Sequence, residues 1–245
     1  MRLDLYLFES GKCSSRTEAK GFIASGAVSV NGKVVTKPAL EVSGEEAILL
    51  DKSSKKYVSR GGLKLEGALS EFKIDVRGRL AIDVGASSGG FTDCLLKHGC
   101  ERVIAVDSGS GQIAESLRSD SRVNVIENYN ARYMRREDFE YLPDLAVMDV
   151  SFISATYIIE PLSECVAEGG DFICLIKPQF EVGKSGLGKG GIVKDERIRR
   201  SAVEKVTLFA ASKGFALKGV IDSPIAGGDG NREYLAHFVK ESVFE

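Results

Sequence analysis

Charged side chains end four apolar runs of the sequence, and these positions could carry chemistry. Asp83 and Asp107 lie at the ends of "LAIDV" and "VIAVD", Asp149 follows "LAVM", and Lys177 follows "FICLI". Ligands of open α/β sheets bind just beyond the carboxyl ends of the strands. If these runs are parallel strands, we expect the three acids and the lysine to meet at one edge of a sheet.

Lys177 is the unusual member of this group. It ends a very hydrophobic run directly before Pro178, so its ammonium group is partly desolvated unless it reaches water. Desolvation lowers the pKa of a lysine, and a lysine tuned to roughly 7–8 can serve as a general base. We therefore predict that Lys177 accepts a proton.

A glycine-rich turn follows Asp83 and leads into an amphipathic segment. It reads "DVGASSGGFTD" over residues 83–93, so it lacks the middle glycine of the dinucleotide motif and the Gly-Lys-Ser/Thr of a P-loop. An acid before such a turn suits a ligand with an ammonium group, because glycines let the backbone approach closely. Asp107 lies 24 residues beyond Asp83, close to the spacing at which an acid binds a nucleoside ribose. The pattern favours S-adenosylmethionine over NAD; the alternative is that the glycines only tighten a turn and that Asp83 is buried and capped.

The elements that must position these residues are apolar runs alternating with helical patterns. The runs span residues 80–84, 103–106, 123–126, 145–148 and 172–176. Such alternation predicts βαβ units and a mainly parallel, doubly wound sheet. Leu65, Leu69 and Phe72 repeat at helical spacing, which places Lys64 near the start of a helix.

Residues 1–50 predict a separate small α/β unit, and the polar residues 51–60 predict a linker. Two helix-like segments each end at a glycine, and Asn31-Gly32 joins two β-branched runs as a hairpin. Residues 1–60 hold ten Lys and Arg against seven Asp and Glu, whereas the remainder holds 23 against 28. Cations of this unit, such as Arg16 and Lys20 on one side of the second helix, could form a phosphate-binding face. An ordinary solvated helix surface is the alternative.

This first unit resembles the small RNA-binding module of ribosomal small-subunit protein four. The match comprises Arg2-Leu3-Asp4, Ser15-Arg16, the stretch from Gly26 to Gly32 and Lys37-Pro38, and it covers nearly the whole unit. The resemblance implies RNA binding. We assign this role to Arg2, Lys12, Arg16, Lys20, Lys33, Lys37 and Arg60.

The residues after the fourth run restrict the atom that could be methylated. The sequence there is "MDVSF" instead of the Asn/Asp-Pro-Pro-Tyr/Phe motif of enzymes that methylate exocyclic amines of nucleic acids. A nucleophilic cysteine in a Pro-Cys setting, as used for ring carbons of pyrimidines, is also missing from the sequence. A hydroxyl acceptor is therefore favoured.

The second unit resembles the FtsJ-type ribose 2′-O-methyltransferases, and the whole chain resembles the TlyA family of ribosomal RNA 2′-O-methyltransferases, historically called haemolysins. The matching segments are "SRGGLKLEGAL", "DVGASSGGFTD", "DVSFIS", "LIKPQFEVG", "GKGGIVKD" and "GDGNREYL". The resemblance implies a catalytic tetrad of Lys64, Asp149, Lys177 and Glu233. It also implies a Rossmann-like domain over residues 61–245 that binds S-adenosylmethionine. We assign the cofactor site to Asp83, Gly85, Ala86, Ser87, Gly89, Gly90, Phe91, Asp107, Asn130 and Asp149.

The tetrad has a physical interpretation as well. A ribose hydroxyl is a weak acid and must lose its proton as it attacks the methyl group, with Lys177 as the base. Lys64 would bring a second positive charge nearby, and Asp149 and Glu233 would orient the lysines and the ribose; the scheme needs no metal. Each residue also has a simpler interpretation. Lys64 could be a surface lysine, Glu233 a charge at a hairpin end, and Asp149 the N-cap of a helix starting at residue 152.

Composition excludes several other classes. Five cysteines without a CxxC pair and two distant histidines argue against disulfides and a metal site. Neither a signal-peptide core nor an apolar run of about 20 residues is present, so we expect a soluble, cytoplasmic monomer that acts on ribosomal RNA or a ribosomal subunit. Two alternatives remain, an RNA-binding or ribosome-assembly protein without turnover and a membrane-active haemolysin. The segment "GKSGLGKGG" over 183–191 could contact RNA phosphates or be only a flexible loop.

Overall fold

The computed structural model describes residues 1–24, 26–51, 56–183, 186–227 and 230–242. The predicted linker, the segment 183–191 and the motif at 228–235 lie partly outside these residues, at 52–55, 184–185 and 228–229. The chain divides into two compact units, Met1–Arg60 and Gly61–Glu245, and each is described by itself.

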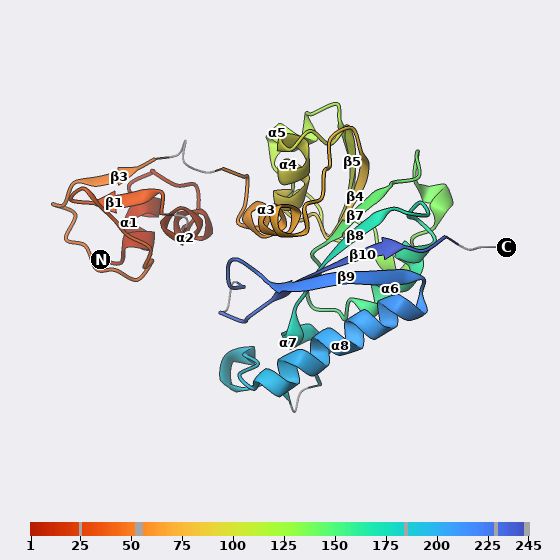
Figure 1. Cartoon of the computed structure of the whole chain (residues 1–245). Helices are drawn as coiled ribbons and strands as arrows, with labels where there is room; N and C mark the ends of the chain where they lie inside the picture. Colours follow the sequence, from red (N-terminus) through yellow and green to blue (C-terminus); the bar gives the residue numbers. More distant parts are fainter. Residues whose placement is uncertain (25, 52–55, 184–185, 228–229, 243–245) are drawn as a thin grey trace. The chain divides into compact units, whose positions relative to one another are not determined.

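The first unit combines two helices with a three-stranded antiparallel sheet (Figure 1). Its elements are α1 (Leu3–Glu9), α2 (Arg16–Ala24), β1 (Val28–Val30), β2 (Lys33–Val34) and β3 (Ile48–Leu50), with the strand order β2-β1-β3. Asn31 and Gly32 both have positive φ, 50° and 78°, as a two-residue hairpin turn requires. Ser15 Oγ accepts the Glu18 N–H (3.1 Å) at the start of α2, as expected of an N-cap. Leu3, Leu7 and Ile23 are fully buried in the core between these elements.

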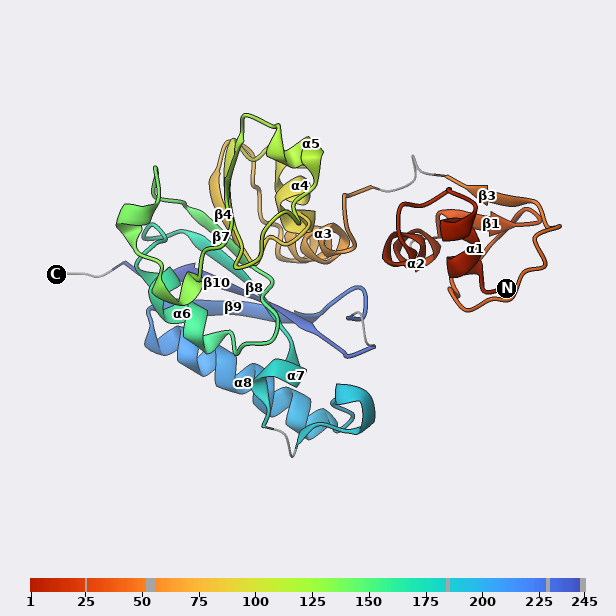
Figure 2. The ribbon, with the colours of Figure 1, turned by 180° about the vertical axis from the view of Figure 1, so that it is seen from behind.

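The second unit is a seven-stranded sheet covered by helices on both faces (Figures 1 and 2). The strands are β4 (Leu80–Val84), β5 (Arg102–Val106), β6 (Val123–Ile126), β7 (Leu145–Met148), β8 (Asp171–Ile176), β9 (Phe215–Asp222) and β10 (Tyr234–Lys240). Their order is β6-β5-β4-β7-β8-β10-β9. The first five strands are parallel, and β10 inserts antiparallel between β8 and β9. The predicted doubly wound α/β fold with a small α/β unit before it is confirmed.

Helices α3, α4 and α5 lie on one face of this sheet, and α6 and α8 lie on the other (Figures 1 and 2). The helices are α3 (Gly61–Phe72), α4 (Gly90–Lys97), α5 (Glu115–Arg118), α6 (Thr156–Ser163), α7 (Pro178–Glu181) and α8 (Glu196–Ser212). Short 3₁₀ turns add η2 (Ala131–Tyr133), η3 (Arg136–Asp138) and η5 (Lys189–Gly191). Because both faces are covered, β4, β7 and β8 are nearly continuous apolar runs.

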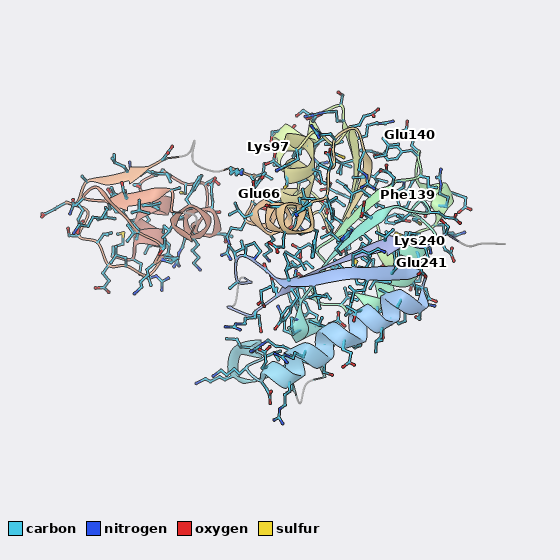
Figure 3. All side chains as sticks on the ribbon, in the orientation of Figure 1. Glu66, Lys97, Phe139, Glu140, Lys240 and Glu241 are labelled. Carbon is cyan, nitrogen blue, oxygen red and sulfur yellow. The ribbon has the colours of Figure 1, made fainter. Side chains whose placement is uncertain are left out.

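Side chains fill the space between the sheet and the helices (Figure 3). Phe172 of β8 is fully buried against Phe215 and Phe238, with ring centroids 5.1 and 5.5 Å apart. All five cysteines are buried, and none of them forms a disulfide bond. Within the described ranges, no helix is long and apolar enough to cross a membrane, and no group of three or more His, Cys, Asp or Glu could hold a metal ion.

Candidate active site

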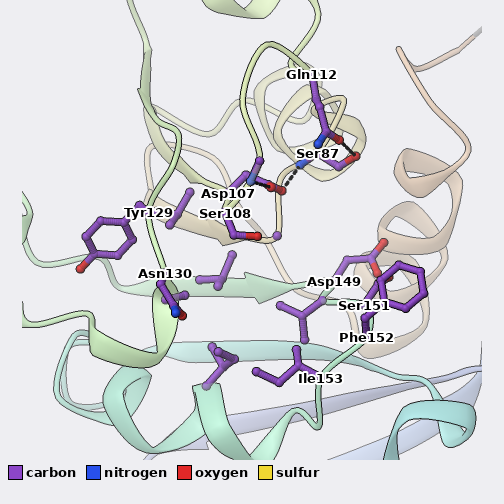
Figure 4. Close-up of a pocket in the computed structure, with 17 residues that line it drawn as sticks. Ser87, Asp107, Ser108, Gln112, Tyr129, Asn130, Asp149, Ser151, Phe152 and Ile153 are labelled. Atoms are coloured by element: carbon purple, nitrogen blue, oxygen red, sulfur yellow. Dashed lines mark hydrogen bonds between the residues drawn. The ribbon is translucent and has the colours of Figure 1, made fainter.

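A pocket of about 460 Å³ opens at the carboxyl ends of β4, β5 and β7 (Figure 4). The chain builds β5 and β6 on one side of β4 and then β7 on the other, so the strand order reverses here. This is the position at which doubly wound sheets bind ligands, and the volume is in the usual range for small-molecule sites. Gly85, Asp107, Asn130, Asp149 and Phe152 are among the residues that line it.

Asp107 joins the loop after β4 to the loop after β5 (Figure 4). Its carboxylate accepts the Ser87 N–H (2.7 Å) and the Gly109 N–H (2.7 Å), and Ser87 Oγ donates to Gln112 Oε1 (3.1 Å). The two N–H groups leave part of the carboxylate free to accept hydrogen bonds, since each oxygen has two lone pairs. An acid in this position can bind ribose hydroxyl groups.

Gly85 brings the backbone of the β4–α4 loop against the loop that follows β7. Its φ is +86°, and a Cβ at this position would lie 2.5 Å from the Asp149 carbonyl oxygen. A side chain could not be accommodated without moving one of the two loops. The glycine therefore fixes one wall of the pocket. The sequence motif suggested that its glycines allow such close approach of the backbone.

Asp83 does not line the pocket, although the sequence suggested that its carboxylate could attract a cofactor ammonium group directly or through water. It is fully buried, and its Oδ2 accepts the Thr92 N–H (2.9 Å) and Oγ1–H (2.6 Å) at the start of α4. Burial raises the pKa of this carboxyl group to about 7. Asp83 thus holds α4 against β4.

The ten residues assigned to the cofactor site divide into two groups. Gly85, Ser87, Asp107, Asn130 and Asp149 line the pocket, whereas Asp83, Ala86, Gly89, Gly90 and Phe91 do not. Those in the second group are buried around the turn and the first residues of α4, where Gly89 adopts the left-handed conformation (φ 88°) and precedes the helix. They shape the turn from which the pocket residues project.

Lys177 lies at the carboxyl end of β8 beside the end of β7. Its Nζ is 2.5 Å from Asp149 Oδ1 and donates a hydrogen bond to Ser151 Oγ (2.7 Å). The Lys177 side chain is 11% exposed, so the ammonium group is largely removed from water. Asp149 also lines the pocket, and the ion pair therefore borders the cofactor site. Helix α6 starts at Thr156 after Ala155, so Asp149 is not its N-cap.

A second ion pair joins α3 to the segment before β10. Lys64 Nζ donates to Glu233 Oε2 (2.5 Å), with the two side chains 10% and 3% exposed. Tyr234 of β10 pairs with Ile176 of β8, so the next residues along these antiparallel strands are Glu233 and Lys177. The structure thus brings all four residues of the predicted tetrad to the same edge of the sheet, from elements up to 169 residues apart.

The cations predicted to bind RNA are spread over the surface of the first unit. Arg2 and Arg16 both donate to the fully buried carboxylate of Asp4, at 2.9 and 3.0 Å, and each side chain is about half exposed. The remaining cations are exposed or half-buried: Lys12, Lys20, Lys33, Lys37 and Arg60. Asp4 therefore aligns two arginines that face solvent.

Several residues of the site were not predicted from the sequence. Ser108, Gly109, Gln112 and Tyr129 line the pocket beside Asp107, and Ser151 and Phe152 line it beside Asp149. The proximity of Gly109 to a strand-ending acid is a signal that the sequence offers. For Phe152 the sequence gives no comparable signal. A bulky apolar residue is not expected to have a φ of 63° or a side chain that is 92% exposed.

A sheet of this order, with a glycine turn after the first strand and an acid after the second, is typical of a Rossmann-like S-adenosylmethionine-dependent methyltransferase. Comparison with known proteins gives the same result. Residues 57–240 match the model of the FtsJ-like methyltransferases, and residues 1–48 match that of the S4 domain.

The chain is 43% identical to the 16S/23S rRNA (cytidine-2′-O)-methyltransferase TlyA of Mycobacterium tuberculosis, over 96% of this chain and 88% of that protein. It is 42% identical to hemolysin A of Brachyspira hyodysenteriae, over 98% of this chain and all of that one. A solved structure described as a hemolysin of Streptococcus thermophilus superposes with a TM-score of 0.78 at 42% identity, covering 99% of this chain and 89% of that chain. The chain belongs to the FtsJ-like methyltransferase family, in the group with an amino-terminal S4 domain that includes the TlyA proteins. Its cofactor is S-adenosylmethionine, as predicted, and the pocket fits it, since a strand-end carboxylate faces a cavity of suitable volume.

Proposed function

We propose that this enzyme methylates the ribose 2′-hydroxyl of a cytidine in ribosomal RNA. The TlyA relative is named for this reaction, and the S4 domain is an RNA-binding module. The observation that carries the proposal is the position of the Lys177–Asp149 pair, which borders the cofactor pocket where a hydroxyl group would have to lose its proton.

Lys177 is the group that takes this proton. The cofactor supplies a methyl group activated by a positively charged sulfur. As the ribose oxygen bonds to that methyl carbon, the carbon–sulfur bond would break and release S-adenosylhomocysteine, and the hydroxyl proton would move to Nζ of Lys177, which must be uncharged to accept it. Ser151 Oγ fixes the orientation of Nζ (2.7 Å), and Asp149 stabilises the ammonium group formed by the transfer (2.5 Å).

Lys64 and Glu233 hold the nucleotide in this proposal. Both side chains are almost completely buried, so each charge requires its partner. Glu233 has a second carboxylate oxygen that can accept a hydrogen bond from ribose, and Lys64 adds a positive charge close to Lys177. In the cofactor pocket, Asp107 would bind the ribose hydroxyls of the cofactor, and Asn130 and Gly85 would form its walls.

We further propose that residues 1–50 and 61–245 act as separate domains joined by residues 51–60. Arg2, Lys12, Arg16, Lys20, Lys33, Lys37 and Arg60 would contact phosphates of the ribosomal RNA. This division places affinity for RNA mainly in the first domain and the reaction in the second. The enzyme would act as a monomer on a ribosomal subunit in the cytoplasm.

The test is methyl transfer from labelled S-adenosylmethionine to purified small and large ribosomal subunits. We expect label on cytidine 2′-oxygens, located by reverse transcription at limiting nucleotide concentration, and none with Lys177→Met. Lys218→Met is the matched control, because Lys218 is an exposed lysine of the edge strand β9. RNA binding without any label on either subunit would instead support a protein without turnover.

A further inference from the structure

Residues 177–181 hold the loop between β7 and α6 at three points. Lys177 contacts Asp149 and Ser151 at the start of the loop. The Phe180 ring lies against that of Phe152, with centroids 5.2 Å apart. The end of the loop is held by Glu181, the last residue of α7.

Glu181 is the buried end of this arrangement. Its side chain is 2% exposed, and its carboxylate accepts the Ser154 hydroxyl (2.5 Å) and the Ala155 N–H (2.7 Å). Lys205 of α8 donates to the same carboxylate and to the Glu181 carbonyl oxygen, each at 3.0 Å. A buried carboxylate that accepts three hydrogen bonds, two from the loop and one from α8, defines the position of both segments well.

The loop that Glu181 holds forms a wall of the cofactor pocket. Val150, Ser151, Phe152 and Ile153 all line the pocket (Figure 4). Phe152 has a φ of 63°, a conformation that bulky residues adopt only where the surroundings enforce it. The side chain of Phe152 is 92% exposed, so its own burial does not enforce this conformation. Its support comes from the contacts that hold the loop, those of Lys177 with Ser151, of Phe180 with Phe152 and of Glu181 with Ser154.

We propose that Glu181 is a positioning residue that sets the pocket wall and the proton acceptor in a single arrangement. Lys177 directly precedes α7 and Glu181 is its last residue, so a shift of the loop end at Ser154 moves the partners of Lys177 as well as the wall that faces the cofactor. This inference rests on the proposed role of Lys177. The expected effect of Glu181 on cofactor binding does not depend on the role of Lys177.

The test compares Glu181→Gln with Glu160→Gln. Glu160 also links α6 to α8, through Lys213 (2.6 Å), but its side chain is 61% exposed and it does not contact the loop. We expect Glu181→Gln to lower kcat for methyl transfer about 10- to 100-fold and to weaken S-adenosylmethionine binding several-fold, with the KM for RNA unchanged. Glu160→Gln should change neither quantity.

Ser154→Ala provides a second variant in case Glu181→Gln does not fold. It removes one donor to Glu181 and should produce both effects in the same direction, about two- to fivefold each. A lower melting temperature for Glu181→Gln, with kcat and cofactor affinity as in the wild type, would show a merely structural role and overturn the proposal. Calorimetry of cofactor binding separates this outcome from failure of the proposed function. If ribosomal RNA were not the substrate, the loss of cofactor affinity would still be observed.

Discussion

In the second unit, ion pairs lie at both edges formed by the strand ends, the carboxyl edge and the amino edge, but their cations differ. At the carboxyl edge the cations are lysines, Lys177 with Asp149 and Lys64 with Glu233. At the amino edge Arg79, directly before β4, pairs with Asp144 (3.3 Å) and Asp171. His237 of β10 also contacts Asp171, with Nε2 2.6 Å from Oδ1.

The choice of lysine or arginine gives the ion pairs at the two edges different properties. A guanidinium group is always protonated and binds carboxylates in a fixed, forked geometry, whereas a lysine can gain and lose a proton. Burial opposes ionisation of Asp171, but the hydrogen bonds from His237 and Arg79 outweigh it and keep its pKa below the usual value. The amino edge is therefore built to remain charged. The carboxyl edge borders the cofactor pocket, where the proposed transfer of a proton to Lys177 would take place.

Lys177→Arg would test this distinction most directly. Arginine keeps the charge beside Asp149 but cannot release its proton near neutral pH, so we expect single-turnover methyl transfer to fall about 10²- to 10⁴-fold. Cofactor affinity, measured by calorimetry, should stay within about twofold, which is well under 1 kcal/mol. Lys218→Arg on the exposed edge strand is the control. A Lys177→Arg rate within tenfold of the wild type would mean that the charge alone is required.

Asp83, near the carboxyl end of β4, has no cationic partner among the residues that the structure describes, and burial raises its pKa to about 7. The folded state therefore binds a proton more tightly than the unfolded state between about pH 4 and 7. Over this window the contribution of Asp83 to the free energy of unfolding falls as pH rises. We expect Asp83→Asn to remove this dependence, so that its stability relative to the wild type improves by roughly 3 kcal/mol between pH 4 and pH 8.

Urea unfolding of both proteins without cofactor, at several pH values, measures this difference. Asp171 does not interfere with this measurement. Because its pKa is lowered, its contribution to the free energy of unfolding is lost only at lower pH. Parallel stability profiles for Asp83→Asn and the wild type would show that Asp83 is ionised at neutral pH in the folded protein.

Arg79→Lys is the counterpart of the lysine substitution at the opposite edge. A lysine cannot reproduce the fork that contacts Asp144 and Asp171 together, so we expect the free energy of unfolding to fall by about 1–3 kcal/mol. The methylation rate of the folded enzyme should not change. Chemical denaturation and single-turnover kinetics on the same sample check both parts, and a large loss of rate would contradict a purely structural role for the amino edge.

The first unit offers a third arrangement, in which a buried acid holds cations that face solvent. Burial of Asp4 opposes its ionisation, but hydrogen bonds from Arg2 and Arg16 outweigh it and lower its pKa. Asp4→Asn should leave both arginines charged but less well oriented, and we expect about a three- to tenfold loss of RNA affinity. Fluorescence anisotropy at two salt concentrations measures it, with Glu9→Gln on the exposed end of α1 as the control. Equal affinities for Asp4→Asn and the wild type would remove this role from Asp4.

The sequence allowed the parallel part of the sheet and the strand-end residues to be predicted because both are local patterns. Three of the five predicted strands have the observed bounds, and the other two, β5 and β8, start one residue earlier. The antiparallel pair β9 and β10 was not predicted, since β9 is an edge strand with several exposed residues and few signs of a buried run. Asp107 and Asp149 lie in the pocket as expected, whereas the burial of Asp83 depends on how α4 packs over it. The left-handed Phe152 depends on contacts with α7, which its own residue type does not indicate.

The insertion of β10 between β8 and β9 has a consequence for how the enzyme becomes competent. In the sheet β9 pairs only with β10, and the segment that enters with β10 also delivers Glu233 to Lys64. A chain still being synthesised, or one that has lost this strand, exposes the edge of β8 and leaves the Lys64 ammonium group without its acid. Completion of the sheet therefore also assembles the Lys64–Glu233 pair, so folding of the last strands and formation of the proposed nucleotide site are coupled.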